Sequence, residues 1–112
     1  MQALLLEQQD GKTLASVQTL DESRQPEGDV TVDVHWSSLN YKDALAITGK
    51  GKIIRNFPMI PGIDFAGTVR TSEDPRFHAG QEVLLTGWGI GENHWGGLAE
   101  QARGESDRLV AQ

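Results

Sequence analysis

The stretch PGIDFAG at residues 61–67 decides the fold together with SSLNYKD at residues 37–43. Pro58 and Pro61 interrupt regular structure, because a proline ring fixes φ and removes a backbone donor. A strand is predicted over Asp64–Thr71. The earlier stretch predicts a helix from Tyr41 to Thr48, with Ser37 or Ser38 as caps at its start and Gly49 as a left-handed C-cap. A short helix and a strand joined by a proline-containing loop are therefore expected.

Strands account for most of the remaining chain. Asp10-Gly11 is a hairpin signal between two of them. Valines and a tryptophan alternate with polar residues over Val30–Trp36, which predicts a half-buried strand with Trp36 on its buried face. The other expected strands are Ala3–Glu7, Lys12–Leu20, Gln81–Thr86 and Leu98–Ala102. We therefore predict a mostly β fold, a partly open β-barrel with one or two short helices.

Composition limits the class of protein. The 112 residues predict a single domain, 1–112, and a net charge of −6 disfavours nucleic acid and anionic membranes as partners. The chain contains no cysteine, so neither a disulfide nor a thiolate metal site can form. No apolar stretch approaches the ~20 residues that span a bilayer. We expect a cytoplasmic protein.

Four segments in order carry a family resemblance. They are NYKD at 40–43, the proline loop at 58–67, FHAGQEV at 77–83 and GGLAE at 96–100. This set resembles the catalytic, GroES-like domain of the medium-chain dehydrogenase/reductases. Within that family, NYKD and the short GWG loop look most like the zinc-independent quinone oxidoreductase branch, closest to the bacterial acrylyl-CoA reductase type. The resemblance implies a GroES-like barrel and an oxidoreductase that uses NADPH to reduce the activated C=C bond of a small-molecule substrate, acrylyl-CoA or a quinone-like acceptor.

The residues at the family's metal positions predict no metal. Zinc-dependent relatives place Cys where this chain has Asn40 and His where it has Ile63, and neither an amide nor an alkyl group is a zinc ligand. The three histidines, His35, His78 and His94, lack a spacing that would gather them.

Four residues are candidate site residues by this resemblance: three at the helix start, and Asp64 at the start of the strand that follows the proline loop. Tyr41 is expected either to contact the nicotinamide end of the cofactor or a substrate carbonyl, or to pack the helix on the barrel. Asn40 is either a cofactor contact or a helix cap. Asp43 is either catalytic or a loop anchor that accepts backbone hydrogen bonds. Asp64 is a catalytic candidate whose structural alternative is pairing with a cation or with loop amides.

Two further stretches admit two interpretations each. Trp88 and Trp95 are expected to form the substrate pocket or to cover the barrel end. The basic stretch over residues 48–55 either attracts phosphates of a coenzyme or is a solvated surface loop. GWGIG at 87–91 is not a dinucleotide fingerprint, because no helical pattern follows it.

The resemblance also implies a coenzyme domain that this chain lacks. Because such enzymes hold the cofactor between two domains, we expect no cofactor on this chain alone and no activity from it. The polar run RGESDR at 103–108 departs from the family pattern, as does the tail 103–112 as a whole. This favours an isolated, engineered domain that is a monomer. The alternative is a non-catalytic, stand-alone β-barrel scaffold or folding model.

Overall fold

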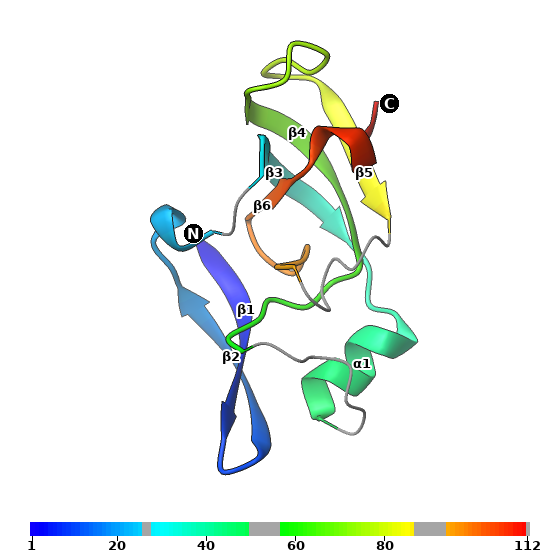
Figure 1. The fold of residues 1–112 in the computed structure, drawn as a ribbon. Helices are drawn as coiled ribbons and strands as arrows, with labels where there is room; N and C mark the ends of the chain where they lie inside the picture. Colours follow the sequence, from blue (N-terminus) through cyan, green and yellow to red (C-terminus); the bar gives the residue numbers. More distant parts are fainter. Residues whose placement is uncertain (26–27, 50–56, 87–93, 112) are drawn as a thin grey trace.

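The computed structural model describes residues 1–25, 28–49, 57–86 and 94–111, and its fold is mostly β (Figure 1). A two-stranded sheet pairs β1 with β2, and a five-stranded sheet has the order β6-β3-β4-β5-β7, with every pairing antiparallel. This confirms the predicted fold class. The strands are β1 (Gln2–Gln9), β2 (Lys12–Thr19), β3 (Val30–Ser37), β4 (Asp64–Ser72), β5 (Glu82–Thr86), β6 (Gln101–Gly104) and β7 (Val110–Ala111), with the helix α1 (Tyr41–Thr48) and the 3₁₀ turns η1 (Glu22–Arg24) and η2 (Ser106–Arg108).

The N-terminal hairpin forms as predicted. Asp10 and Gly11 both have positive φ, 52° and 77°, which suits the tight turn between β1 and β2. The other edge of β1 is joined to the rest of the barrel: Leu4 N donates to Leu98 O at 2.9 Å, and Leu6 exchanges two hydrogen bonds with Met59 at 2.7 and 2.9 Å. The hairpin's backbone hydrogen bonds to the rest of the barrel therefore come from β1, and the start of β2 lies against the end of α1, where Thr13 is beside Gly49.

Strand β3 is an interior strand of the larger sheet, paired with β4 on one side and with the edge strand β6 on the other. Val30 and Val32 are fully buried, as the alternation predicted. The prediction was wrong for Trp36, whose side chain is 76% exposed. The register with β4 shifts between Val34 and Trp36, and such a bulge turns the end of the strand away from the core.

Helix α1 has the predicted bounds, and Gly49 ends it with φ of 73°. The N-cap is Asn40, which confirms the helix-cap role that was one of its two expected roles, and the prediction of Ser37 or Ser38 as the cap was wrong. The last predicted strand also began too early. Leu98 and Ala99 contact β1, and hydrogen bonding to β3 begins at Glu100, whose carbonyl accepts from Val34 N at 2.8 Å.

The buried side chains form one large cluster and two small ones. The large cluster consists mostly of side chains from the five-stranded sheet, and the small clusters lie beneath the hairpin and beneath α1. The large cluster contains Val30, Val32, Phe65, Val69, Phe77, Val83, Leu85, Ala102 and Leu109; the small ones contain Ala3, Leu5, Leu20 and Ile60, and Leu6, Ala46 and Met59.

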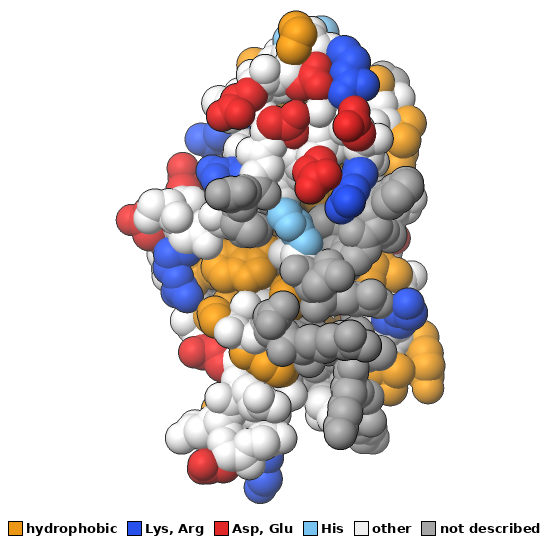
Figure 2. All heavy atoms as spheres, viewed as in Figure 1, with side chains coloured by type: hydrophobic (Ala, Val, Ile, Leu, Met, Phe, Trp, Pro, Cys, Tyr) orange, Lys and Arg blue, Asp and Glu red, His pale blue; other side chains and the backbone are white. Residues whose placement is uncertain are grey.

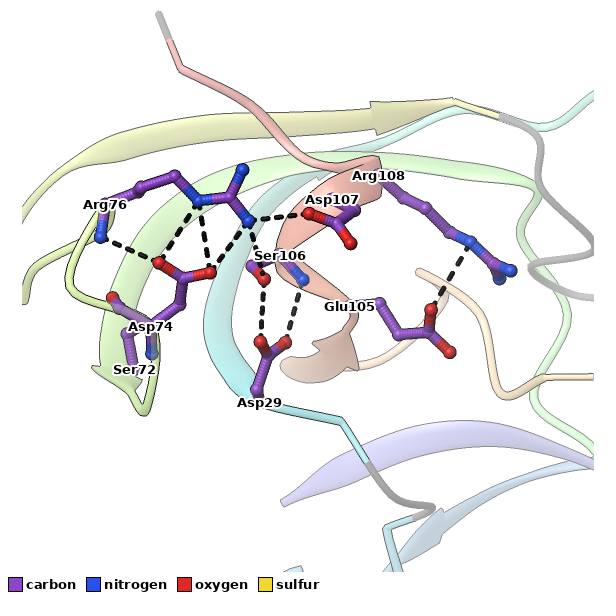
Figure 3. Close-up of polar contacts among 8 residues, drawn as sticks. All are labelled: Asp29, Ser72, Asp74, Arg76, Glu105, Ser106, Asp107 and Arg108. Carbon is purple, nitrogen blue, oxygen red and sulfur yellow. Dashed lines mark hydrogen bonds and ion pairs between the residues drawn. The ribbon is translucent and has the colours of Figure 1, made fainter.

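The polar run near the C-terminus is folded against the barrel (Figure 3). Ser106 donates from its backbone N and from Oγ to the two carboxylate oxygens of Asp29, both at 2.7 Å. Arg76 Nη2 lies 2.8 Å from Asp74 Oδ2 and 2.6 Å from Asp107 Oδ1. These contacts hold η2 in place, and β7 after it pairs with β5.

We predict that Asp74→Asn destabilises the fold only when carboxylates are ionised. The Arg76 guanidinium holds the pKa of the Asp74 carboxyl well below its ordinary value. The ionised carboxylate therefore stabilises the folded state fully above the unfolded-state pKa of about 4, and this stabilisation is lost as pH falls through the folded-state pKa. Urea midpoints of the variant and the parent should differ at pH 7, and the difference should shrink progressively as pH falls below about 4 toward the folded-state pKa. Glu105→Gln, in an exposed ion pair with Arg108, is the control and should change little. A midpoint difference that persists at low pH would contradict the prediction.

We predict that Gln25→Leu stabilises the chain. Gln25 is 8% exposed, its Nε2 contacts only Met1 Sδ at 3.2 Å, and its Oε1 has no hydrogen-bond partner among the described residues. A buried amide oxygen without a donor costs about 1–2 kcal/mol, which the leucine should recover in the free energy of unfolding measured with urea. Gln8→Leu, at an exposed position, is the matched control and should change it little. An equal gain in both variants would show that burial at position 25 is not the cause.

Candidate functional site

Asp43 connects the start of α1 to the proline loop. Its side chain is 1% exposed. Oδ1 accepts hydrogen bonds from Gly62 N at 3.0 Å and Ile63 N at 3.2 Å, and Oδ2 accepts one from Asn40 N at 3.0 Å. The structure therefore shows the loop-anchor geometry that was one of the two alternatives for this residue.

The proline loop in turn lies against the segment that begins at Gly96. Gly97 N donates to Gly62 O at 3.0 Å, and Leu98 N donates to Pro61 O at 3.1 Å. Gly62 has φ of 107°, and a Cβ at Gly96 would lie 2.2 Å from Gly62 O. Because side chains fit at neither position, the two backbones meet directly.

Polar side chains extend from Asp43 to the start of β4. Asn40 Nδ2 lies 3.4 Å from Asp43 Oδ2 and donates to Ser38 Oγ at 3.0 Å. Ser38 Oγ donates to Asp64 Oδ1 at 2.5 Å. The sequence had suggested a cation or loop amides as the partner of Asp64, but the partner is the Ser38 hydroxyl. Ser38 itself was considered only as a helix cap, and nothing in its local pattern indicates this bridging position.

Exposed aromatic and aliphatic side chains lie in the same part of the sequence. Tyr41 is 79% exposed and Leu39 is 66% exposed. Tyr41 is therefore not packed between the helix and the described part of the barrel, which was one of its two expected roles. Its phenol group is accessible from solvent at the first residue of α1.

A surface hollow of about 240 Å³ adjoins the polar side chains. Ser38 and Asp64 belong both to its lining and to the hydrogen-bonded set, and exposed Trp36 forms another part of the wall. The full lining is Trp36, Ser37, Ser38, Asp64, Phe65, Ala66, Leu84 and Thr86. A small acceptor could contact both apolar and hydrogen-bonding groups here.

Trp95 lies elsewhere, against the two small core clusters. Its Nε1 donates to Pro58 O at 3.0 Å, and the guanidinium carbon of Arg24 lies 5.9 Å from its ring centroid. This position fits covering the barrel end, and Trp95 is not part of the hollow. Trp88 and most of the basic stretch, residues 50–55, lie outside the described residues.

Within the described ranges, no three His, Asp or Glu side chains gather as metal ligands. His35 Nε2 is 2.9 Å from Thr68 Oγ1, and His94 Nε2 is 2.7 Å from Arg103 O. No helix in the described part of the chain is long and apolar enough to cross a membrane.

Comparison with known proteins agrees with this architecture. The alcohol dehydrogenase GroES-like domain family matches residues 26–111. The chain is 95% identical, over 99% of its length, to the probable acrylyl-CoA reductase AcuI of Escherichia coli K12, and 48% identical, over 93% of its length, to the acrylyl-CoA reductase AcuI of Ruegeria pomeroyi. It spans 34% and 32% of those proteins, about a third of each.

A crystal structure of the YhdH oxidoreductase from Salmonella enterica in complex with NADP superimposes with a TM-score of 0.97 and 86% identity. The superposition covers 99% of this chain and 34% of that one.

We predict that Asp43→Ala lowers the free energy of unfolding by about 3–5 kcal/mol, because it leaves the N–H donor of buried Gly62 and those of partly buried Ile63 and Asn40 without their acceptor. Ser38→Ala, which removes a more exposed hydrogen bond, is the matched control and should cost less than about 1 kcal/mol. Urea unfolding followed by tryptophan fluorescence would measure both. Equal costs for the two variants would show that Asp43 is not the main anchor.

Proposed function

The chain belongs to the alcohol dehydrogenase GroES-like domain family, and on that premise we propose that it is the substrate-side domain of an NADPH-dependent oxidoreductase that reduces activated C=C bonds. Acrylyl-CoA is the proposed acceptor class, with quinone-like compounds as the related alternative. The observation that carries the proposal is the 95% identity, over nearly the whole chain, to a probable acrylyl-CoA reductase.

The groups at the start of α1 fit a nicotinamide. Asn40 carries an amide and Tyr41 a phenol, and both neutral groups can exchange hydrogen bonds with a carboxamide. Tyr41 is exposed, so its hydroxyl can reach a ligand. NADPH, when bound, would supply the hydride. We assign the orientation of its nicotinamide end to Asn40 and Tyr41.

Tyr41 is also the proposed donor to the substrate carbonyl. As hydride adds to a conjugated double bond, negative charge develops on that oxygen, and a donor aimed at it stabilises the charge. The carboxylates have a different proposed role. Asp43 accepts backbone hydrogen bonds with both oxygens and Asp64 accepts from Ser38, so we assign both to positioning the helix start rather than to proton transfer.

The reaction is proposed to need no zinc. The amide of Asn40 and the alkyl side chain of Ile63 stand at the family's ligand positions, and neither binds zinc. Donor groups, rather than a metal, would then stabilise the charge on the acceptor.

This chain by itself is proposed to be inactive and to bind no cofactor. Every strand pairing among the described residues is antiparallel, whereas the pyrophosphate of a dinucleotide is held by a unit of parallel strands and a crossover helix. The alternative of a stand-alone, non-catalytic barrel is supported by one feature, the polar contacts that close the five-stranded sheet at η2 and β7. That the domain is engineered stays a prediction.

A chimera tests the proposed function. Residues 1–111 of this chain would replace the corresponding third of the Escherichia coli relative, and loss of NADPH absorbance with acrylyl-CoA would be followed. We expect activity within about tenfold of that relative. We expect Tyr41→Phe in the chimera to lower kcat about 10- to 100-fold and to weaken NADPH binding only slightly, because Asn40 still contacts the nicotinamide. The chain alone should oxidise no NADPH above the blank.

Gln8→Leu in the chimera is the control, because Gln8 is exposed and is not among the residues that line the hollow. It should leave kcat unchanged. A folded chimera that binds NADPH but does not reduce acrylyl-CoA would refute the proposed function, whereas full activity of the Tyr41→Phe chimera would refute only the role of Tyr41.

A further inference from the structure

The outer edge of β2 presents unused backbone hydrogen-bonding groups. Met1 and Leu20 exchange hydrogen bonds at 2.8 and 2.7 Å, so they form a hydrogen-bonded pair of the β1–β2 ladder. Such pairs alternate along an antiparallel ladder. The backbone groups of the four residues at alternate positions therefore point away from β1, and they have no hydrogen-bond partner among the described residues; these are Thr13, Ala15, Val17 and Thr19.

This edge lacks the features that normally prevent pairing with another chain. Edge strands are usually protected by charge, proline or a bulge. TLASVQTL at residues 13–20 contains no charged residue and no proline, and β2 pairs with β1 over eight residues without a register shift. Leu14 is 48% exposed and Val17 is 69% exposed.

Most of this edge is also accessible. Figure 1 shows the two strands of the hairpin crossing, with the end of β2 on the outer side of the molecule and its start on the side of α1. Ala15, Val17 and Thr19 are exposed, whereas Thr13 is partly buried and lies beside Gly49 at the end of α1. In the same view, Figure 2 shows charged side chains gathered at the upper end and sparse along the hairpin until its tip.

We propose that β2 pairs antiparallel with β2 of a second copy of this chain, joining the two hairpins into one four-stranded sheet. Residues that exchange hydrogen bonds across the new ladder must both point outward. Only one register uses all the outward residues: Thr13 lies opposite the second copy's Thr19, Ala15 lies opposite its Val17, and the two-fold axis passes between the two Ser16 residues.

Side-chain chemistry supports the same register. Lys12 of one copy lies opposite Leu20 of the other and next to its Asp21, so a cation meets an anion at each end of the ladder. All of these groups except Leu20 are exposed in the single chain. The new contact between Val17 and Ala15 covers apolar surface at the rim of a hollow of about 420 Å³ that Leu4, Val17 and Leu98 help to line. The dimer replaces the monomer expected from the polar run at 103–108, which lies at the end of β6 and in η2 and is not part of the hairpin.

A cysteine cross-link tests the register, because the chain has no cysteine of its own. In Ser16→Cys the two thiols face each other across the two-fold axis, with Cα atoms about 4.5 Å apart, within disulfide range. In the control Thr13→Cys the two thiols are six residues apart along the ladder, about 20 Å. With oxidised glutathione, we expect Ser16→Cys to form a reducible covalent dimer at least about tenfold faster than Thr13→Cys. Equal rates would overturn the proposed register.

Sedimentation velocity tests the association itself. The weight-average mass should rise with concentration from 12.2 kDa toward twice that value. Ala15→Pro should remain monomeric with an unchanged circular dichroism spectrum, because it removes an outward N–H that β1 does not use. The control Leu39→Lys changes an exposed apolar residue outside the hairpin and should still dimerise. A parent chain that stays at 12.2 kDa, an Ala15→Pro variant that dimerises, or a Leu39→Lys variant that does not would each overturn the proposal.

Discussion

One buried carboxylate sets the geometry on which the candidate site depends. Asp43 lies in the first turn of α1 and accepts hydrogen bonds from the proline loop and from the residue that caps the helix. A buried carboxyl group is tolerable only while hydrogen-bond donors satisfy it, and Gly62, Ile63 and Asn40 supply those donors. The helix start and the loop therefore behave as one unit, and Asn40, Ser38 and Asp64 take their positions from it.

Local signals in the sequence predicted the elements near this unit. The turn residues Asp10 and Gly11, the helix bounds with Gly49 as its cap, and the strand that begins at Asp64 all depend on neighbours in sequence. The predictions were wrong where contacts between segments distant in sequence determine the structure. Trp36 is exposed because the register with β4 shifts, and Leu98 pairs with β1 before β6 begins.

The candidate site could be predicted only in part for the same reason. The resemblance indicated Asn40, Tyr41, Asp43 and Asp64, and the first, third and fourth of these lie in one hydrogen-bonded set. It gave no sign of Ser38, which connects them. Nor could it show that the polar run near the C-terminus is part of the barrel, because Ser106 finds its partner Asp29 across 77 residues of sequence.

The contact between Gly62 and Gly96 has a consequence for how such a domain diversifies. Because the two backbones touch, neither position can acquire a side chain without separating the loop from its neighbour. Sequence variation that keeps the loop in place is therefore directed to positions such as Trp36, Leu84 and Thr86, which line the hollow and are exposed or partly exposed. Library design should randomise those positions and hold the glycines fixed.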